Sequence, residues 1–322
     1  MGGYQAITSP ISGAGFDGWL ANADSSAMVR DPAIFKYLTA LKLPYLAVDL
    51  AIAYLLMQFF KDPKNKKKAF VYWLFNPFTI ILIYVFGNID IFPAAITLGA
   101  FLFLKRDKPV AAALLLGLAS GFKLYPLLFA PFLFLSGKNI KEKVMLGTIP
   151  LAVFGVICLP FFSPAFIQSA LVSGLSTGIF RSELTILSVS LLFFYAAFID
   201  KKPNLFKYWI ALFMIIFSFA LFHVQWLTWL APFVVILVIK RPDLTWLVLS
   251  IILIAFMVPL LYEDRFMTLG LMRAYSTLYD LLPTPFVVLQ KFYDPYNLRD
   301  TIHSIMAGGS IILIYKMFRK EV

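Results

Sequence analysis

Residues 69–104 read AFVYWLFNPFTIILIYVFGNIDIFPAAITLGAFLFL, and they decide the fold class. The stretch holds two apolar runs, 69–86 and 91–104, and its single charged residue is Asp90 in the short polar turn between them. An α-helix needs about 20 residues to cross roughly 30 Å of hydrocarbon, so each run is close to the length of a membrane-crossing helix. The stretch therefore predicts two membrane helices joined by a tight polar turn.

The whole chain has the composition of a membrane protein. Of its 322 residues, 61% are hydrophobic, 17% aromatic and only 14% charged, whereas a soluble domain has about 45–50% apolar and about 25% charged residues. This composition excludes a disordered chain, a coiled coil and a collagen-like fibre. A disulfide-stapled secreted module is excluded as well, because Cys158 is the only cysteine. We predict an all-α polytopic integral membrane protein.

Eleven apolar runs predict a bundle of about eleven transmembrane or half-spanning helices. They cover residues 43–60, 69–86, 91–104, 109–122, 124–135, 144–162, 184–199, 208–222, 227–239, 244–261 and 301–318. Several runs are too short to cross a bilayer alone, notably 124–135, which contains Pro126 and Pro131. We therefore expect some broken or half-inserted helices that line a cavity.

The basic residues collect in alternate loops, which predicts the orientation of the chain. Six loops carry 19 of the 28 Lys and Arg residues but only 6 of the 17 acidic residues. These loops are 61–68, 105–108, 137–143, 200–207, 240–243 and 316–322. These loops have a net charge of +13, and the remainder of the chain has −2. By the positive-inside rule the six loops and the C-terminus are cytoplasmic.

The same rule places the other end of the bundle on the non-cytoplasmic side of the cell membrane, or of the endoplasmic reticulum in a eukaryote. The predicted organisation is a non-cytoplasmic segment over 1–42 and a membrane domain over 43–322, which includes an outer loop over 262–300. That loop could be a lid over a site or an interfacial amphipathic helix that caps the bundle.

The polar residues outside the basic loops gather at the predicted outer face. The candidate site residues there are Asn88, Asp90, Lys123, Tyr125, Arg181, Glu183, His223, Gln225 and Trp226. Asp49 lies about six residues into the first predicted span. Ionisable residues are costly in a membrane, so their convergence on one side favours a polar site that opens outward.

Several of these residues also have a purely structural interpretation. Asp90 could cap the helix that follows it, and Lys123 could extend its ammonium group to the interface. Asp49 could be buried against Lys123 as a structural ion pair. Trp226 and Trp229 fit an aromatic belt at the interface better than a ligand cage.

Three stretches, in this order, resemble a known family. They are NP at 76–77 followed by GNID at 87–90, GFKLYP at 121–126, and FHVQWLTWLAP at 222–232. They resemble the polytopic C-type glycosyltransferases (GT-C), particularly the mannosyltransferases related to the catalytic subunits of the GPI mannosyltransferases. The resemblance covers roughly residues 42–232.

The resemblance implies transfer of a sugar, mannose by analogy, from a polyprenyl-phosphate donor to a hydroxyl of a glycan or glycolipid on the non-cytoplasmic side. In such a reaction a carboxylate accepts the proton of the attacking hydroxyl, while cations and hydrogen-bond donors hold the leaving phosphate. Lys123 and Arg181 suit the phosphate, with Tyr125 and His223 as donors beside them. The donor is already activated, so no nucleotide site is required, and a divalent metal ion is left open.

The catalytic base is not identified by the resemblance. Relatives begin with a further helix, and the outer loop after it carries the acidic residue usually assigned as the base. Three interpretations stay open: the chain is N-terminally incomplete, the base is Asp90 or one of Asp17, Asp24 and Asp31, or the protein is not catalytic.

Two other classes of function compete with a glycosyltransferase. The broken helices would also suit a carrier or flippase for a lipid-linked saccharide, although the apolar inner halves of the spans disfavour it. The third class is a noncatalytic subunit of a glycosyltransferase complex. All three classes have lipids and lipid-linked sugars as partners, and none involves nucleic acid.

Overall fold

The computed structural model describes residues 10–13, 15–22, 25–172, 182–201, 203–220, 222–263, 265, 268–273 and 275–319. Within these ranges the chain forms helices joined by short turns, and it contains no β-strand. The predicted class, an all-α polytopic membrane protein, is confirmed.

The first half of the chain forms ten helices among the described residues. They are α2 (Phe16–Leu20), α3 (Ser25–Arg30), α4 (Ile34–Met57), α5 (Pro63–Leu74), α6 (Pro77–Ile80), α7 (Ile91–Lys105), α8 (Pro109–Phe122), α9 (Ala130–Leu135), α10 (Ile140–Cys158) and α11 (Pro164–Phe166). The second half contributes α13 (Glu183–Phe194), α14 (Leu205–Phe219), α15 (Leu227–Lys240), α16 (Thr245–Met257), α17 (Pro285–Leu289) and α18 (Pro295–Arg319).

Short 3₁₀ and π turns extend or link several of these helices. Those used below are η1 (Ile81–Val85), η2 (Tyr125–Phe129), η3 (Leu159–Phe161), η7 (Val224–Trp226), η11 (Leu269–Met272) and η12 (Thr277–Asp280).

All eleven predicted apolar runs fall on helices, but few of these helices have full membrane length. Three are long and apolar enough to cross a bilayer alone: α4, α10 together with η3, and α18. Helix α5 together with α6 and η1 is also long and apolar enough, but the two parts are bent by 41° and form either a broken span or a re-entrant loop. Seven further apolar helices in the described part of the chain have 10–17 residues, which agrees with the expectation that several runs are too short to span alone.

The helix breaks occur where the sequence places proline. At the bend after α5, the side chain of Asn76 accepts a hydrogen bond from the backbone N–H of Phe78 at 3.0 Å, and Pro77 begins α6. Proline has no N–H to donate and suits the first turn of a helix, so one helix ends here and another begins. The predicted broken segment 124–135 likewise forms the 3₁₀ turn η2 followed by α9.

Helix α4 begins at Ile34, nine residues before the predicted start of the first span. The reason is a small outer cluster of apolar side chains. Ile34, Tyr37 and Ala40 recur every three residues on one face of α4, and they pack against Phe16 and Trp19. The predicted polar segment 1–42 therefore supplies the first turns of a membrane helix.

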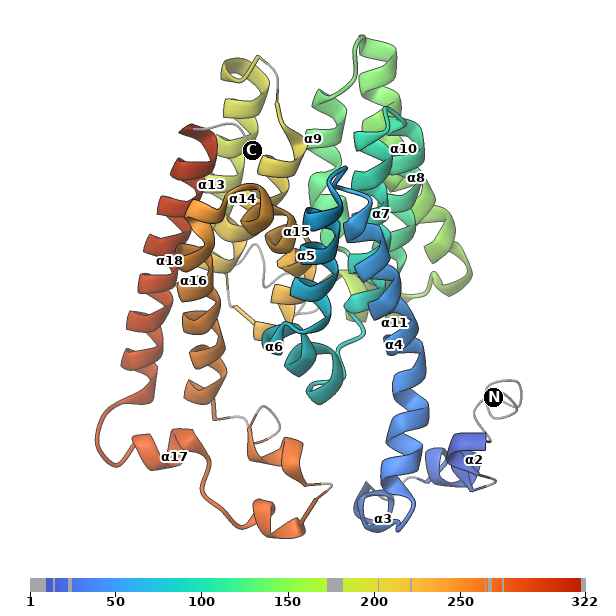
Figure 1. Cartoon of the computed structure of the whole chain (residues 1–322), viewed down its shortest axis with the longest axis vertical. Helices are drawn as coiled ribbons and strands as arrows, with labels where there is room; N and C mark the ends of the chain where they lie inside the picture. The colour runs from blue at the N-terminus through green and yellow to red at the C-terminus, as the bar shows by residue number, and fades with distance from the viewer. Residues whose placement is uncertain are drawn as a thin grey trace.

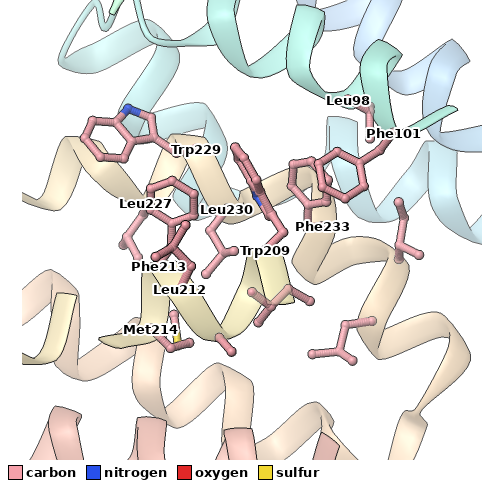
Figure 2. Packing of buried hydrophobic residues seen from close by; sticks show 14 of the residues in the cluster. Leu98, Phe101, Trp209, Leu212, Phe213, Met214, Leu227, Trp229, Leu230 and Phe233 are labelled. Carbon is pink, nitrogen blue, oxygen red and sulfur yellow. The ribbon is translucent and has the colours of Figure 1, made fainter. Parts of the chain in front are cut away.

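Helix α14 lies at the centre of the bundle, and residues 208–214 are all buried. The ring centroid of Trp209 lies 5.3 Å from that of Phe101 on α7 and 5.2 Å from those of Phe129 and Phe233. Figure 2 shows Phe101 and Phe233 beside Trp209, with the aliphatic side chain of Leu230 nearby. A helix that is apolar on all sides is expected to be buried in this way.

Helices α8 and α10 pack closely because α8 carries glycines at their interface. A Cβ atom added to Gly117 would lie 2.6 Å from Cβ of Val153 and 2.8 Å from the carbonyl oxygen of Pro150. Gly121, one turn later, faces the side chain of Ile157. Small residues spaced four apart are a common device for close packing of membrane helices.

The two ends of the bundle differ in charge. The turns that join α4 to α5, α9 to α10 and α13 to α14 lie toward the upper end in Figure 1, together with the end of α18. These are predicted basic loops, so we call this end the basic end. Helices α2, α3 and α17 lie at the opposite end.

Candidate functional site

An ion pair between Asp90 and Lys123 forms the centre of the candidate site. Nζ of Lys123 lies 2.8 Å from each carboxylate oxygen of Asp90. The Asp90 side chain is fully buried, whereas that of Lys123 is 38% exposed. Asp90 precedes α7 and Lys123 follows α8, and these two helices form an antiparallel hairpin. The hairpin therefore places the start of α7 beside the end of α8, which brings Asp90 and Lys123 together.

Trp229 of α15 holds this ion pair from a third element. Its Nε1–H donates to Oδ2 of Asp90 at 2.7 Å, and Nζ of Lys123 lies 5.3 Å from the centroid of its ring. The Tyr125 ring stacks on the Trp229 ring, with 4.2 Å between the ring centroids and an angle of 7° between the ring planes. The Trp226 ring also stacks on Trp229, with 5.1 Å between the centroids. The aromatic stack fixes the orientation of the indole N–H that binds Asp90.

Asn88 connects the turn before α7 to the turn before α15. Its Oδ1 accepts the backbone N–H of Asp90 at 3.0 Å, and its Nδ2 donates to the carbonyl oxygen of Gln225 at 3.0 Å and to Oγ1 of Thr228 at 3.3 Å. Gly87 has a φ of +66°, which glycine adopts without strain. Asn88 thus positions the carboxylate of Asp90 through the backbone.

His223 lies at the edge of the same cluster, with its ring centroid 5.5 Å from that of Trp226. Burial, reinforced by the positive charge of Lys123, lowers the pKa of His223 below its usual value. The imidazole is consequently neutral at pH 7, and it can both donate and accept a hydrogen bond.

Tyr125 is placed inside the protein rather than at the open face. Its side chain is only 1% exposed. Its hydroxyl is buried beside that of Thr97, but neither forms a hydrogen bond of good geometry within the described ranges. The ring of Tyr125 therefore supports Trp229 by stacking.

The other predicted site residues lie apart from this cluster or outside the described residues. Glu183 begins α13, while Arg181 and the candidate base Asp24 lie outside the described residues. Asp17 lies in the first turn of α2, and Oδ1 of Asp31 accepts the backbone N–H of Ala33 at 2.8 Å.

The structural interpretations of two acidic residues are wrong. Asp90 occupies the N-cap position of α7, but its side chain makes no capping hydrogen bond, because it faces Lys123 and Trp229 instead. Asp49 does not pair with Lys123. Its carboxylate accepts hydrogen bonds from Nε1 of Trp73 at 2.7 Å and from the hydroxyl of Tyr84 at 2.9 Å, both within the broken helix pair beside α4.

A cavity of about 840 Å³ lies between α4, η1 and part of residues 262–300, the predicted outer loop, which we call the outer segment. The predicted outer loop 262–300 contributes Gly270, Met272, Arg273 and Tyr275 to its wall. Within the described residues this segment forms the short helices η11, η12 and α17 and the first turn of α18, rather than one long amphipathic helix.

Lys42 connects this cavity to the turn before α7, and it was not among the predicted site residues. It lines the cavity, and its Nζ lies 2.7 Å from the point where a Cβ atom would stand on Gly87.

Trp229 was also absent from the predicted site residues, because the sequence placed it in an aromatic belt. Its position in the third motif, FHVQWLTWLAP at 222–232, is the signal that could have identified Trp229 as a site residue. Across the described ranges, no group of three His, Cys, Asp or Glu side chains is arranged to hold a metal ion.

Comparison with known proteins identifies a family. The model of glycosyltransferase family 87 matches residues 32–282, which is more than half of the chain. The matched region contains the three motifs, the ion pair and the cavity lining except Trp19, Met28 and Val29. No curated protein and no solved structure matches the chain significantly.

Proposed function

The chain belongs to glycosyltransferase family 87, a GT-C-type family of polytopic membrane glycosyltransferases, and from this premise we propose a specific reaction. The protein transfers a hexose, mannose by analogy with the mannosyltransferases it resembles, from a polyprenyl-phosphate donor to a hydroxyl of a glycan or glycolipid acceptor. The basic end of the bundle faces the cytoplasm, and the site faces the other side of the membrane.

The observation that carries the proposal is the partly exposed ammonium group of Lys123 above a buried carboxylate. An ammonium group has three N–H donors, and Asp90 accepts hydrogen bonds from Lys123 through both of its oxygens. A third donor is left for a phosphate oxygen of the substrate. As the bond between C1 of the sugar and the phosphate oxygen breaks, negative charge develops on the phosphate, and a fixed cation stabilises that charge.

The geometry favours a positioning role for Asp90 over its predicted role as the base. Its side chain is fully buried, and both oxygens accept hydrogen bonds from Lys123 or Trp229. A base must have a free oxygen within reach of the acceptor hydroxyl. We therefore assign Asp90 to hold the ammonium group of Lys123 in place.

Asp31 is the preferred candidate for the base among the predicted acids. It is partly exposed, and of its oxygens only Oδ1 has a hydrogen-bond partner in the part of the chain that the structure describes. Val29 and Ile34, on either side of it, line the 840 Å³ cavity. In the proposed step the acceptor oxygen bonds to C1, its proton passes to the carboxylate, and polyprenyl phosphate departs.

Transfer by the purified full-length chain in lipid nanodiscs tests the proposal. We expect labelled hexose to pass from polyprenyl phosphate to a lipid or glycan acceptor, with mannose preferred over glucose. Lys123→Met should lower kcat by about 10²- to 10³-fold, the usual effect of removing one group that stabilises developing charge. Lys138→Met, at an exposed lysine of the basic end, should have no effect.

Two results would contradict the proposal. If the protein uses a nucleotide sugar and not a polyprenyl donor, the donor class is wrong. If Lys123→Met folds and retains full activity, the ion pair is not part of the site.

A further inference from the structure

A lysine without an acidic partner lies in the wall of the largely apolar cavity described above. Among the described residues, Lys42 has no ion pair and no side-chain hydrogen bond, and its ammonium group lies 5.1 Å from the ring centroid of Tyr45. A cation in apolar surroundings is costly unless an anion or hydrogen-bond acceptor compensates it. The environment of Lys42 therefore suits an anionic ligand.

The shape of the cavity suits a ligand with a long apolar chain. One face of α4 lines it, because the contributing residues recur at spacings of three and four: Phe35, Leu38, Thr39, Lys42, Leu43 and Leu46. Val85 of η1 and Met272 of the outer segment add further apolar surface, and both are exposed to the cavity side. The only cation that α4 contributes to this wall is Lys42.

The depth of Lys42 in the bundle suits a lipid headgroup. It precedes the end of α4 at Met57 by 15 residues, or about 22 Å of helix. The hydrocarbon core is about 30 Å thick, so the ammonium group lies within reach of the headgroups on the side opposite the basic end.

Lys42 also lies next to the turn that carries the candidate site. Its Nζ is close to Gly87, and the hydroxyl of Tyr45 donates to the carbonyl oxygen of Gly87 at 3.2 Å. Asp90 follows three residues later and binds Lys123. Lys42 and Lys123 are therefore two cations that contact one short turn.

From this geometry we infer that Lys42 binds the phosphate of a polyprenyl phosphate whose isoprenoid chain lies in the cavity between α4, η1 and the residues Gly270, Met272 and Tyr275. The inference rests on the proposed function, because it locates the lipid phosphate of the donor. It adds a phosphate ligand on α4 and a chain-binding surface that the three motifs do not contain.

Binding of undecaprenyl phosphate, which carries no sugar, tests this subsite without any transfer reaction. The full chain in phosphatidylcholine nanodiscs is titrated with undecaprenyl phosphate, and bound lipid is counted by native mass spectrometry. We expect Lys42→Met to weaken binding at least 10-fold, and Lys42→Arg to stay within about 3-fold of the wild type because it keeps the cation. Lys36→Met is the matched control, since Lys36 is exposed on the same helix and outside the cavity, and it should bind as the wild type does.

Three further probes separate the phosphate from the chain. Undecaprenol, which has no phosphate, should bind weakly and equally to wild type and Lys42→Met, and millimolar inorganic phosphate should not displace the lipid. Phosphatidic acid should compete poorly. If it competes as well as undecaprenyl phosphate, the cavity is a general anionic-lipid site and the inference is overturned.

The outcome is independent of the transfer assay. Equal affinity of folded wild type and Lys42→Met would overturn the subsite even if hexose transfer is observed. Conversely, Lys42-dependent binding without transfer from any polyprenyl donor would retain the subsite and reject the proposed reaction.

Discussion

Both carboxylate oxygens of Asp90 lie 2.8 Å from Nζ of Lys123, although 33 residues separate the two in the sequence. The anion is fully buried and the cation is partly exposed. Lys123 and Trp229 therefore compensate the buried carboxylate, and the ammonium group keeps one side open to a ligand.

Removal of either partner should destabilise the protein, and removal of both should cost less than the sum. Lys123→Met leaves a buried, unpaired carboxylate, and breaking such a pair costs about 3–5 kcal/mol when both groups are buried. Because Lys123 is partly exposed, we expect about 1–3 kcal/mol from thermal or denaturant unfolding. The double variant Asp90→Asn/Lys123→Met should recover part of the stability but none of the activity. Strictly additive free energies would contradict a direct coupling.

His223 should titrate below its ordinary pKa of about 6.5. Burial and the charge of Lys123 both lower its pKa, so Lys123→Met should raise it part of the way back. As the pH falls below about 6.5, the unfolded state takes up the proton first, so the folded state loses stability until the pH passes the lowered pKa.

Nuclear magnetic resonance of labelled histidine measures this pKa directly. The chain has only two histidines, and a His303→Gln variant assigns the signals. An unchanged His223 pKa in Lys123→Met would show that the two side chains do not interact.

Gly117→Ala should destabilise the packing of α8 on α10, because its Cβ would lie within 3 Å of Val153 and Pro150. Overpacking of this kind costs about 1–3 kcal/mol. Gly155→Ala on α10 is the control, since a Cβ there meets nothing within 4 Å and alanine favours the helix by about 0.5–1 kcal/mol. Thermal unfolding in detergent should lower the Tm of the first variant and keep or raise that of the second.

Tyr125→Phe should leave both stability and transfer nearly unchanged. The hydroxyl is buried beside that of Thr97 and forms no hydrogen bond of good geometry among the described residues, so its loss removes a polar group that gains little from hydrogen bonding. Tyr125→Leu, which removes the stacking on Trp229, should lower stability by about 1–3 kcal/mol. A large loss of transfer in a well-folded Tyr125→Phe protein would instead assign the hydroxyl to the substrate, as the sequence pattern suggested.

The sequence predicts the helical runs and the location of Asp90 and Lys123 at the same end of the bundle more successfully than the contacts of α15. The ion pair between them was not predicted, because Asp49 was the expected acidic partner of Lys123. Asp90 and Lys123 flank two consecutive helices of 15 and 14 residues, so a simple hairpin brings them together. Trp229 reaches Asp90 across 139 residues, and no local period encodes such a contact. The first span was placed too late because the Gly, Ser, Ala and Asp content of residues 1–42 is typical of a polar loop, although apolar residues at every third position fix the start of α4.

The lengths of the central helices set the depth of the site in the bilayer. Helices α7, α8, α14 and α15 have only 14 or 15 residues, which span about 21–22 Å against a hydrocarbon core of about 30 Å. The longer helix α4 contacts the same turn through Lys42 and extends eight residues further out, to Ile34. Asp90 and Lys123 therefore lie below the outer end of a spanning helix, so in the proposed reaction the scissile bond would be recessed within the protein rather than at the membrane surface.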